Sequence, residues 1–154
     1  MLIIILSIFI GLLLSLTTLP LGYYSPEWLL LVNMYWAMAL PSNNKMILAF
    51  LSGLLFDVIM GQVLGISALL YVLFIYLTLR LYNFLRYMTV FQQAIIFFVL
   101  LILKLALFVW ISYIVSISID YQSQMLGILS TVFFWPPIFY FLRYIRRKFQ
   151  VREE

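Results

Sequence analysis

The sequence contains no cysteine and no histidine. The absence of cysteine excludes a disulfide framework and thiolate chemistry, and the absence of histidine removes the commonest general base and metal ligand. Charged residues make up only 9% of the chain, against about 25% in an ordinary globular domain. A soluble fold could not cover its own surface with so few polar groups.

Apolar residues take the place of the missing charge. Hydrophobic residues make up 67% of the 154 residues, and the mean hydropathy is +1.17. We therefore predict an all-α integral membrane protein. The first apolar stretch has no basic leader and no cleavage site of small residues, so we expect it to be a retained helix and not a signal peptide.

Catalytic patterns are absent from the sequence as well. It has no nucleophile–base–acid set, no pair of carboxylates within one segment, no glycine-rich phosphate loop and no cluster of metal-ligating residues. We therefore expect no enzyme activity, no catalytic residue, no metal site and no cofactor. The net charge of +4 comes from one edge of the predicted membrane domain, which suits lipid headgroups and not nucleic acid.

The positions of the cations predict a topology. Six apolar segments are predicted at residues 2–19, 27–40, 46–60, 63–79, 94–119 and 124–142, in a single domain 1–154 with a basic tail at 143–154. Eight of the nine Lys and Arg residues fall between or beyond these segments. They are Lys45, Arg80, Arg86, Arg143, Arg146, Arg147, Lys148 and Arg152. A bundle of about six transmembrane helices, with both termini inside, places all eight in the cytoplasm, as the positive-inside rule requires.

The second and third segments are shorter than the roughly 17–25 residues that a straight crossing needs. They are predicted either to cross the membrane or to form a re-entrant hairpin, and both choices leave the C-terminus inside. Pro20 and Pro41 are predicted to end the first two segments. Trp28, Tyr35 and Trp36 are expected near the membrane surface, where amphipathic rings concentrate.

Asp57 lies in a row of small residues. Ala49, Gly53, Asp57 and Gly61 recur every four residues, so they share one helix face, and small residues on such a face let a second helix approach closely. Lys104 is expected at a similar depth and is a candidate partner for the carboxylate. The alternatives are a proton or ion relay, a buried pair that orients two helices, an aspartate that caps a neighbouring backbone, and a lysine that extends to the membrane surface.

Two further patterns have both a structural and a functional interpretation. Trp135-Pro136-Pro137 interrupts the sixth segment and predicts either a packed kink or a break that lines a substrate site. Ser112, Ser116 and Asp120 follow Lys104 at helical spacing. They either line a polar cleft that opens to the outside or form hydrogen bonds between helices.

An ordered set of short motifs resembles the family of the rod shape-determining protein MreD. The motifs run from about residue 26 to the C-terminus, and Lys104 lies outside them. Their residues are Pro26 and Trp28, then Trp36 and Pro41, then Gly53, Asp57, Gly61 and Gly65, then Phe91-Gln-Gln-Ala94, then Trp135 and Pro136 with Phe139 and Arg143. Together with Lys104, the Pro, Trp, Gly and Asp residues of this set are the candidates for helix packing or partner contact.

The resemblance implies a non-catalytic, multi-pass subunit of the rod (elongasome) complex in the bacterial cytoplasmic (inner) membrane. Such a subunit binds MreC and acts with MreB, RodA and a class B transpeptidase in lateral peptidoglycan synthesis and cell shape. The implied fold is similar to the small substrate-binding subunits of energy-coupling-factor transporters. The alternative function is therefore a small-molecule-binding component of a vitamin-type transporter, although no long polar outer loop is predicted to cap a ligand. Whether the chain also forms a homodimer stays open.

Overall fold

The computed structural model describes residues 2–17, 26–42, 44–116 and 120–149, and within these ranges every regular element is a helix. The prediction of an all-α protein is confirmed. The helices are α1 (Leu2–Leu16), α2 (Trp28–Ala39), α3 (Asn44–Met60), α4 (Ile66–Arg80), α5 (Tyr82–Leu85), α6 (Val90–Val115) and α7 (Tyr121–Lys148).

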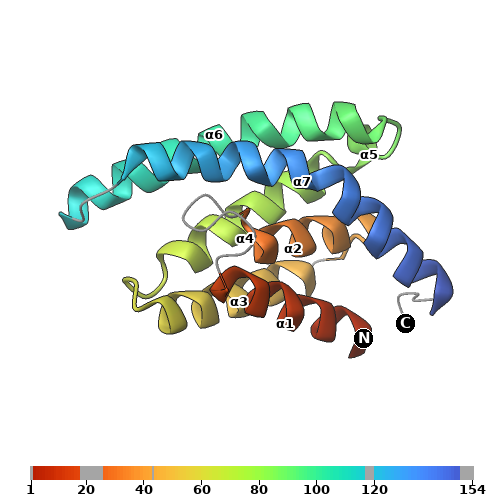
Figure 1. Ribbon diagram of the computed structural model, residues 1–154, viewed down its shortest axis with the longest axis horizontal. Helices are drawn as coiled ribbons and strands as arrows, with labels where there is room; N and C mark the ends of the chain where they lie inside the picture. Colours follow the sequence, from red (N-terminus) through yellow and green to blue (C-terminus); the bar gives the residue numbers. More distant parts are fainter. Residues whose placement is uncertain (1, 18–25, 43, 117–119, 150–154) are drawn as a thin grey trace.

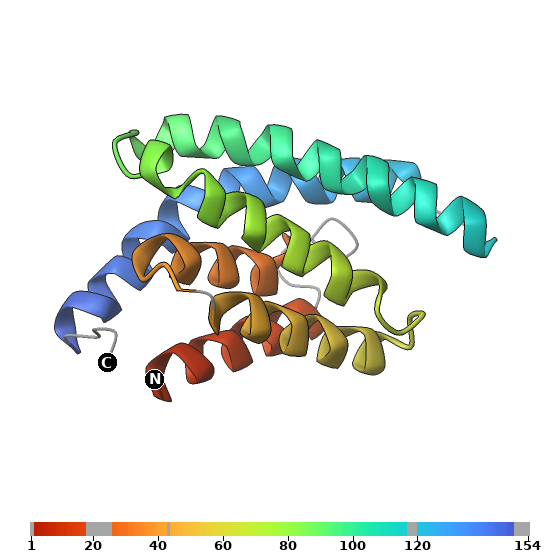
Figure 2. The same ribbon diagram turned by 180° about the vertical axis from the view of Figure 1, so that it is seen from behind.

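The long helices run back and forth along one axis (Figures 1 and 2). α6 and α7 lie side by side along one edge of the molecule, α1 and α3 lie at the opposite edge, and α2 and α4 lie between them. α2 contacts α1, α3, α4 and α7, and α4 also contacts α6. α2 is therefore the centre of the bundle.

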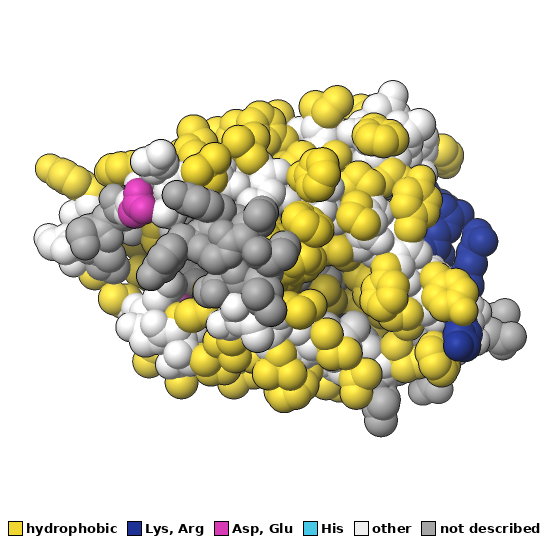
Figure 3. Space-filling view, viewed as in Figure 1, with side chains coloured by type: hydrophobic (Ala, Val, Ile, Leu, Met, Phe, Trp, Pro, Cys, Tyr) yellow, Lys and Arg dark blue, Asp and Glu magenta, His cyan; other side chains and the backbone are white. Residues whose placement is uncertain are grey.

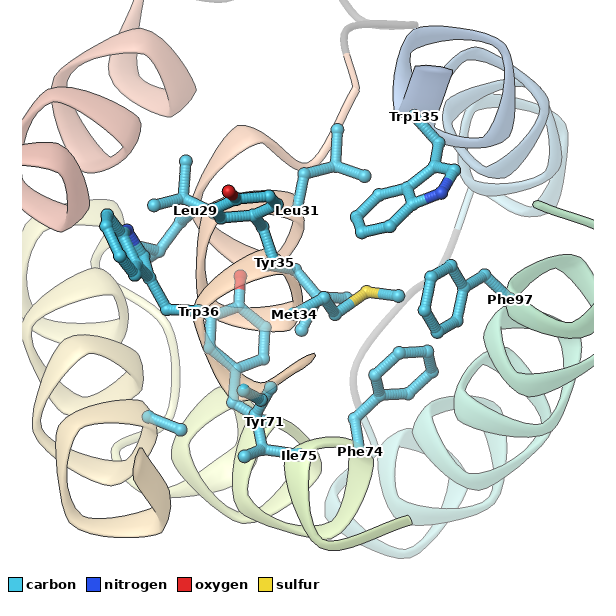
Figure 4. Packing of buried hydrophobic residues seen from close by; sticks show 14 of the residues in the cluster. Leu29, Leu31, Met34, Tyr35, Trp36, Tyr71, Phe74, Ile75, Phe97 and Trp135 are labelled. Carbon is cyan, nitrogen blue, oxygen red and sulfur yellow. The ribbon is translucent and has the colours of Figure 1, made fainter. Parts of the chain in front are cut away.

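The residues of α2 explain this central position. The segment from Leu29 to Ala37 is buried throughout, including Tyr35 and Trp36. A helix that is apolar on every side is surrounded either by other helices or by lipid, and α2 is surrounded by helices. Figure 4 shows Met34 and Tyr35 of α2 among side chains of α4, α6 and α7. Tyr35 and Trp36 fill this core and do not face lipid, and their predicted level near the membrane surface stays a prediction.

The two ends of the bundle differ in charge. The start of α1, the end of α2, α5 and the end of α7 lie at one end, and the α3–α4 turn and the start of α7 lie at the other (Figure 1). We call the first the basic end and the second the outer end. In Figure 3 the visible Lys and Arg side chains gather at the basic end and the visible acidic side chain lies at the outer end. Arg152 lies outside the described residues.

Helix length separates two classes of element. α6 has 26 residues and α7 has 28, which at 1.5 Å per residue gives about 40 Å, more than the roughly 30 Å of a bilayer core. Among the described residues these two helices are long and apolar enough to cross a membrane, and α1, α2 and α4 are shorter apolar helices. The arrangement of six crossings stays a prediction.

The start of α6 and the end of α7 differ from the predicted segments. α6 begins at Val90 because Thr89 and Gln92 form a reciprocal capping box, with Thr89 accepting from the Gln92 N–H. α7 continues past Leu142 to Lys148, so the first basic residues of the tail belong to its last turns. Pro20, the predicted end of the first segment, lies outside the described residues, whereas α2 ends at Ala39, two residues before Pro41.

The two prolines of α7 kink the helix instead of breaking it. Pro136 and Pro137 lie inside one assigned helix, and Figure 1 shows that α7 changes direction along its course. Each proline removes one N–H donor and bends the axis away from the preceding turn. Trp135 is fully buried beside them, and its ring meets that of Phe97 edge-on at 4.6 Å between centroids. The interpretation as a packed kink is confirmed.

Candidate functional site

The contact between α3 and α4 begins with small residues. A Cβ added at Gly53 would lie 2.5 Å from the Cα of Ala68 and 2.9 Å from its backbone nitrogen. Ala49 is also fully buried. Part of the predicted small-residue face therefore packs backbone against backbone. Gly61 does not belong to this contact, because a Cβ there would meet no atom within 4 Å and its φ is +63°.

Asp57 caps the start of α4. Its carboxylate is completely buried and accepts hydrogen bonds from the backbone N–H groups of Gly65, at 2.9 Å, and Ser67, at 3.2 Å. Gly65 is the N-cap residue and has no side chain to satisfy these donors, and its φ of +97° suits glycine. The positive end of the helix also favours the negative charge. The capping alternative for Asp57 is therefore the correct one.

Lys104 forms its ion pair with a different carboxylate. Its Nζ contacts Oε2 of Glu27, next to the start of α2, and lies 5.5 Å from the centre of the Tyr71 ring. The prediction that Lys104 pairs with Asp57 was wrong. Depth along the helices placed both residues at a similar level, but two backbone N–H groups occupy the Asp57 carboxylate, and Glu27 comes within reach of α6.

Sequence reasoning missed Glu27, although a signal was present. Glu27 stands between Pro26 and Trp28 in a quoted motif, and it is one of five acidic residues in the chain. Its backbone N–H donates to the Thr131 hydroxyl of α7 at 3.1 Å. Glu27 therefore joins the start of α2 to both α6 and α7.

A cavity of about 350 Å³ adjoins this ion pair, and we call it the outer cavity. Its polar lining consists of Ser15, Glu27, Gln62, Ser67, Tyr71, Lys104, Ser123 and Gln124. The side chains of Lys104 and Glu27 are 14% and 26% exposed. The opposite charges neutralise each other, so the cavity can hold a polar group by hydrogen bonding, and among its lining residues there is no nucleophile with an adjacent base.

The serine row of α6 does not form the predicted cleft. Ser112 is fully buried, Ser116 is exposed, and neither they nor Asp120 is among the residues that line the outer cavity. Asp120 is the exposed N-cap of α7, and its carboxylate accepts a hydrogen bond from the Ser123 hydroxyl. The hydrogen bonds from Ser123 hold the pKa of Asp120 below its ordinary value.

Three further motif residues pack inside the bundle. Pro26 is buried, the Trp28 ring lies 5.1 Å from that of Phe134, and the Trp36 indole N–H donates to the Ser7 hydroxyl at 2.7 Å. Pro41 is exposed in the α2–α3 connection. Within residues 2–17, 26–42, 44–116 and 120–149 no group of three acidic side chains gathers to hold a metal ion.

Comparison with known proteins identifies the family. The family model described as rod shape-determining protein MreD matches residues 1–145. The chain belongs to the MreD family. A curated relative, the rod shape-determining protein MreD of Haemophilus influenzae, is 32% identical over 148 residues, which cover 94% of this chain and 91% of the relative. No solved structure matches the chain.

Membership in this family confirms the resemblance drawn from the motifs. It supports a role in determining cell shape, and the long apolar helices agree with a membrane protein. MreD proteins are shape-determining components and are not known as an enzyme family. The geometry agrees with this role, because Asp57, Lys104 and the motif tryptophans are used to assemble the bundle.

Proposed function

We propose that the chain is a non-catalytic, multi-pass subunit of the bacterial cytoplasmic membrane that supports rod shape by binding MreC. In this proposal it acts in the rod complex with the MreB filament, RodA and a class B transpeptidase during lateral peptidoglycan synthesis. Its family supports the shape-determining part of the proposal.

The observation that carries the partner-binding part is the outward face of α6. Of the 26 residues of this helix, the buried ones are Gln93, Ala94, Phe97, Leu100, Leu101 and Ser112. The opposite face is exposed and apolar along the whole helix. It consists of Phe91, Ile95, Val99, Leu103, Ala106, Trp110 and Tyr113, and we call it the α6 face.

Ala106 makes the α6 face suitable for a second helix. It is the one small residue of the face and lies one turn from Leu103 and from Trp110, which are 46% and 65% exposed. A small residue between large ones lets a transmembrane helix approach closely and pack against its neighbours. The predicted outer loops are only a few residues long and cannot supply the roughly 1,200 Å² of a stable interface. A partner therefore binds at the level of the membrane.

The proposed orientation has six crossings with both termini in the cytoplasm. It is supported by the gathering of cations at the basic end, where α1 starts and α7 ends (Figures 1 and 3). A reporter active only in the cytoplasm should give signal when fused after Arg152 and none when inserted after Asp120. Signal at both positions, or the reverse pattern, would contradict the orientation.

Affinity purification in mild detergent, followed by mass spectrometry, tests the function itself. We expect MreC to be recovered with the full chain, and we expect depletion of the chain in a rod-shaped host to give rounded cells. A rod-shaped host that grows normally after complete depletion would contradict the shape-determining role.

The outer cavity favours one second candidate, a small-molecule-binding component of a vitamin-type transporter with the fold of such subunits. Its volume of about 350 Å³ lies within the range of about 300–1,000 Å³ that small-molecule sites occupy. Recovery of an ATPase module in place of MreC in the same purification would favour this candidate.

A further inference from the structure

A second cavity, of about 560 Å³, lies at the basic end, and we call it the basic cavity. It is open on one side and is lined by the end of α2, by α5, by the connection at residues 86–89, by the start of α6 and by the last third of α7. It lies at the end of the bundle where the cations gather (Figure 3). It is separate from the ion pair and the cap described above.

Three arginines line the basic cavity, and among its described lining residues none is acidic. Each arginine is positioned by a neutral group. Arg146 donates to the backbone carbonyl of Ala39 at 3.0 Å, Arg143 lies 6.0 Å from the centre of the Phe139 ring, and Arg86 donates to the Tyr82 hydroxyl at 3.4 Å.

These contacts fix the three guanidinium groups without neutralising them. A guanidinium has five N–H donors, so each arginine keeps donors that can reach an anion. Since no carboxylate among the described residues lines this cavity, the three positive charges can attract an anion from outside the bundle. Guanidinium groups match the geometry of phosphate oxygens particularly well.

Two buried polar atoms of the lining have no hydrogen-bond partner among the described residues. The Tyr35 hydroxyl belongs to a side chain that is 2% exposed, and the Gln93 Oε1 atom to one that is 4% exposed. The Gln93 Nε2 atom donates to the carbonyls of Leu85 and Met88, so the amide cannot turn to donate into the cavity. Burial without a partner costs free energy, so a ligand group that reaches either atom recovers part of that cost.

We propose that the basic cavity binds the headgroup of an anionic phospholipid from the cytoplasmic leaflet. The phosphodiester accepts hydrogen bonds from Arg86, Arg143 and Arg146 and from the Tyr35 hydroxyl. Gln93 Oε1 accepts a hydrogen bond from a headgroup hydroxyl, so the preferred headgroup carries hydroxyls, as phosphatidylglycerol does. Tyr140 lines the cavity and is 58% exposed, so it offers the acyl chains a path to the membrane.

The proposal is independent of MreC binding, and it is tested on the purified full-length protein in detergent. Native mass spectrometry is recorded during titration with phosphatidylglycerol, phosphatidylcholine and inorganic phosphate. Replacing Arg143 and Arg146 by Gln together, or Tyr35 by Phe, should weaken phosphatidylglycerol binding by about tenfold or more, because each change removes hydrogen bonds to a charged group. The Tyr35→Phe variant keeps the ring in the core and therefore separates binding from folding.

Arg147→Gln is the matched control, since Arg147 is exposed on the same helix turn and does not line the cavity. It removes one positive charge, where the double variant removes two, and should change binding by less than about twofold if the cavity, and not the general surface charge, holds the lipid. Equal weakening by Arg147→Gln would overturn the proposal, as would equal binding of phosphatidylcholine. Full displacement of phosphatidylglycerol by millimolar inorganic phosphate would also overturn it, because the site would then take free phosphate.

Discussion

α2 and α6 are both apolar helices, but they have opposite surroundings. All nine residues from Leu29 to Ala37 of the 12-residue α2 are buried, whereas α6 buries six of its 26 residues. α2 contacts four other helices, and α6 packs mainly on α7 and α4 (Figures 1 and 4). An apolar sequence therefore does not by itself distinguish a helix that holds the fold from one that faces lipid or a partner.

The polar contacts follow the same division. Asp57 accepts a hydrogen bond at the start of α4, Ser15 accepts one at the start of α2, and Glu27 pairs with Lys104. All three contacts hold packed helices together. On the α6 face the exposed residues are apolar. We expect substitutions in the packed contacts to lower stability, and substitutions on the α6 face to lower association without lowering stability.

The largest expected loss comes from Gly53→Leu. The new Cβ would lie 2.5 Å from the Ala68 Cα, and because the obstacle is backbone, α3 and α4 must separate. We expect the variant not to accumulate in the membrane, as measured by immunoblot. Leu55→Phe, at a position of the same helix that is 56% exposed, is the control and should accumulate normally. Normal accumulation of Gly53→Leu would refute the close approach.

Asp57→Ala is expected to be nearly as severe. It leaves the N–H groups of Gly65 and Ser67 without acceptors and removes the charge at the start of α4, a loss of about 3 kcal/mol. Thermal unfolding in detergent should show a clearly lower Tm for Asp57→Ala. The Tm of Asp57→Asn, which keeps one acceptor oxygen, should lie between those of Asp57→Ala and the unchanged protein. Exchanging the charges of Asp57 and Lys104 should rescue nothing, since these residues do not pair.

The Glu27–Lys104 pair should give a smaller effect. Because both side chains are partly exposed, solvent screens the pair, and we expect Glu27→Lys or Lys104→Glu alone to cost about 1–2 kcal/mol. The double exchange should restore part of the lost Tm, since the new pair has the same partners in reverse. If the double variant loses as much stability as the two single variants lose together, the ion pair contributes nothing.

Asp120 should give the smallest effect, and it is seen most clearly in the pH dependence. Its pKa is lowered in the folded chain, so its contribution to stability is present above the ordinary carboxyl pKa and is lost as the pH falls through the lowered value. Asp120→Asn should therefore flatten the dependence of Tm on pH in that acidic range and slightly lower Tm near neutrality, where the contribution of the carboxylate is fully present. An unchanged acidic slope in the variant would show that the cap does not stabilise α7.

Much of the fold could be predicted from the sequence, because it follows from local patterns. Each of the six apolar runs gave one helix, and Ala49 and Gly53 of the small-residue row lie in the α3–α4 contact. The sequence also located the interruption of α7 at Pro136 and Pro137, since a proline inside a helix kinks or breaks it, but it left open which of the two occurs.

The partners of the buried charges could not be predicted in the same way. Depth along a helix places Asp57 and Lys104 at one level, but it does not give the distance between α3 and α6 across the bundle. The fate of the Asp57 carboxylate depended on Gly65, whose missing side chain leaves two N–H donors free at the start of α4. The surroundings of Tyr35 depended on the central position of α2, which no single segment reveals.

The most direct test of the partner-binding account compares Ala106→Trp on α6 with Leu55→Trp on α3 in one affinity purification. Both residues are exposed, and both variants should accumulate with an unchanged Tm. We predict that Ala106→Trp loses MreC, because the large ring separates the partner helix from the α6 face, and that Leu55→Trp retains it. Retention of MreC by Ala106→Trp, together with its loss on removal of residues 143–154 alone, would place the interface in the cytoplasm and contradict the account.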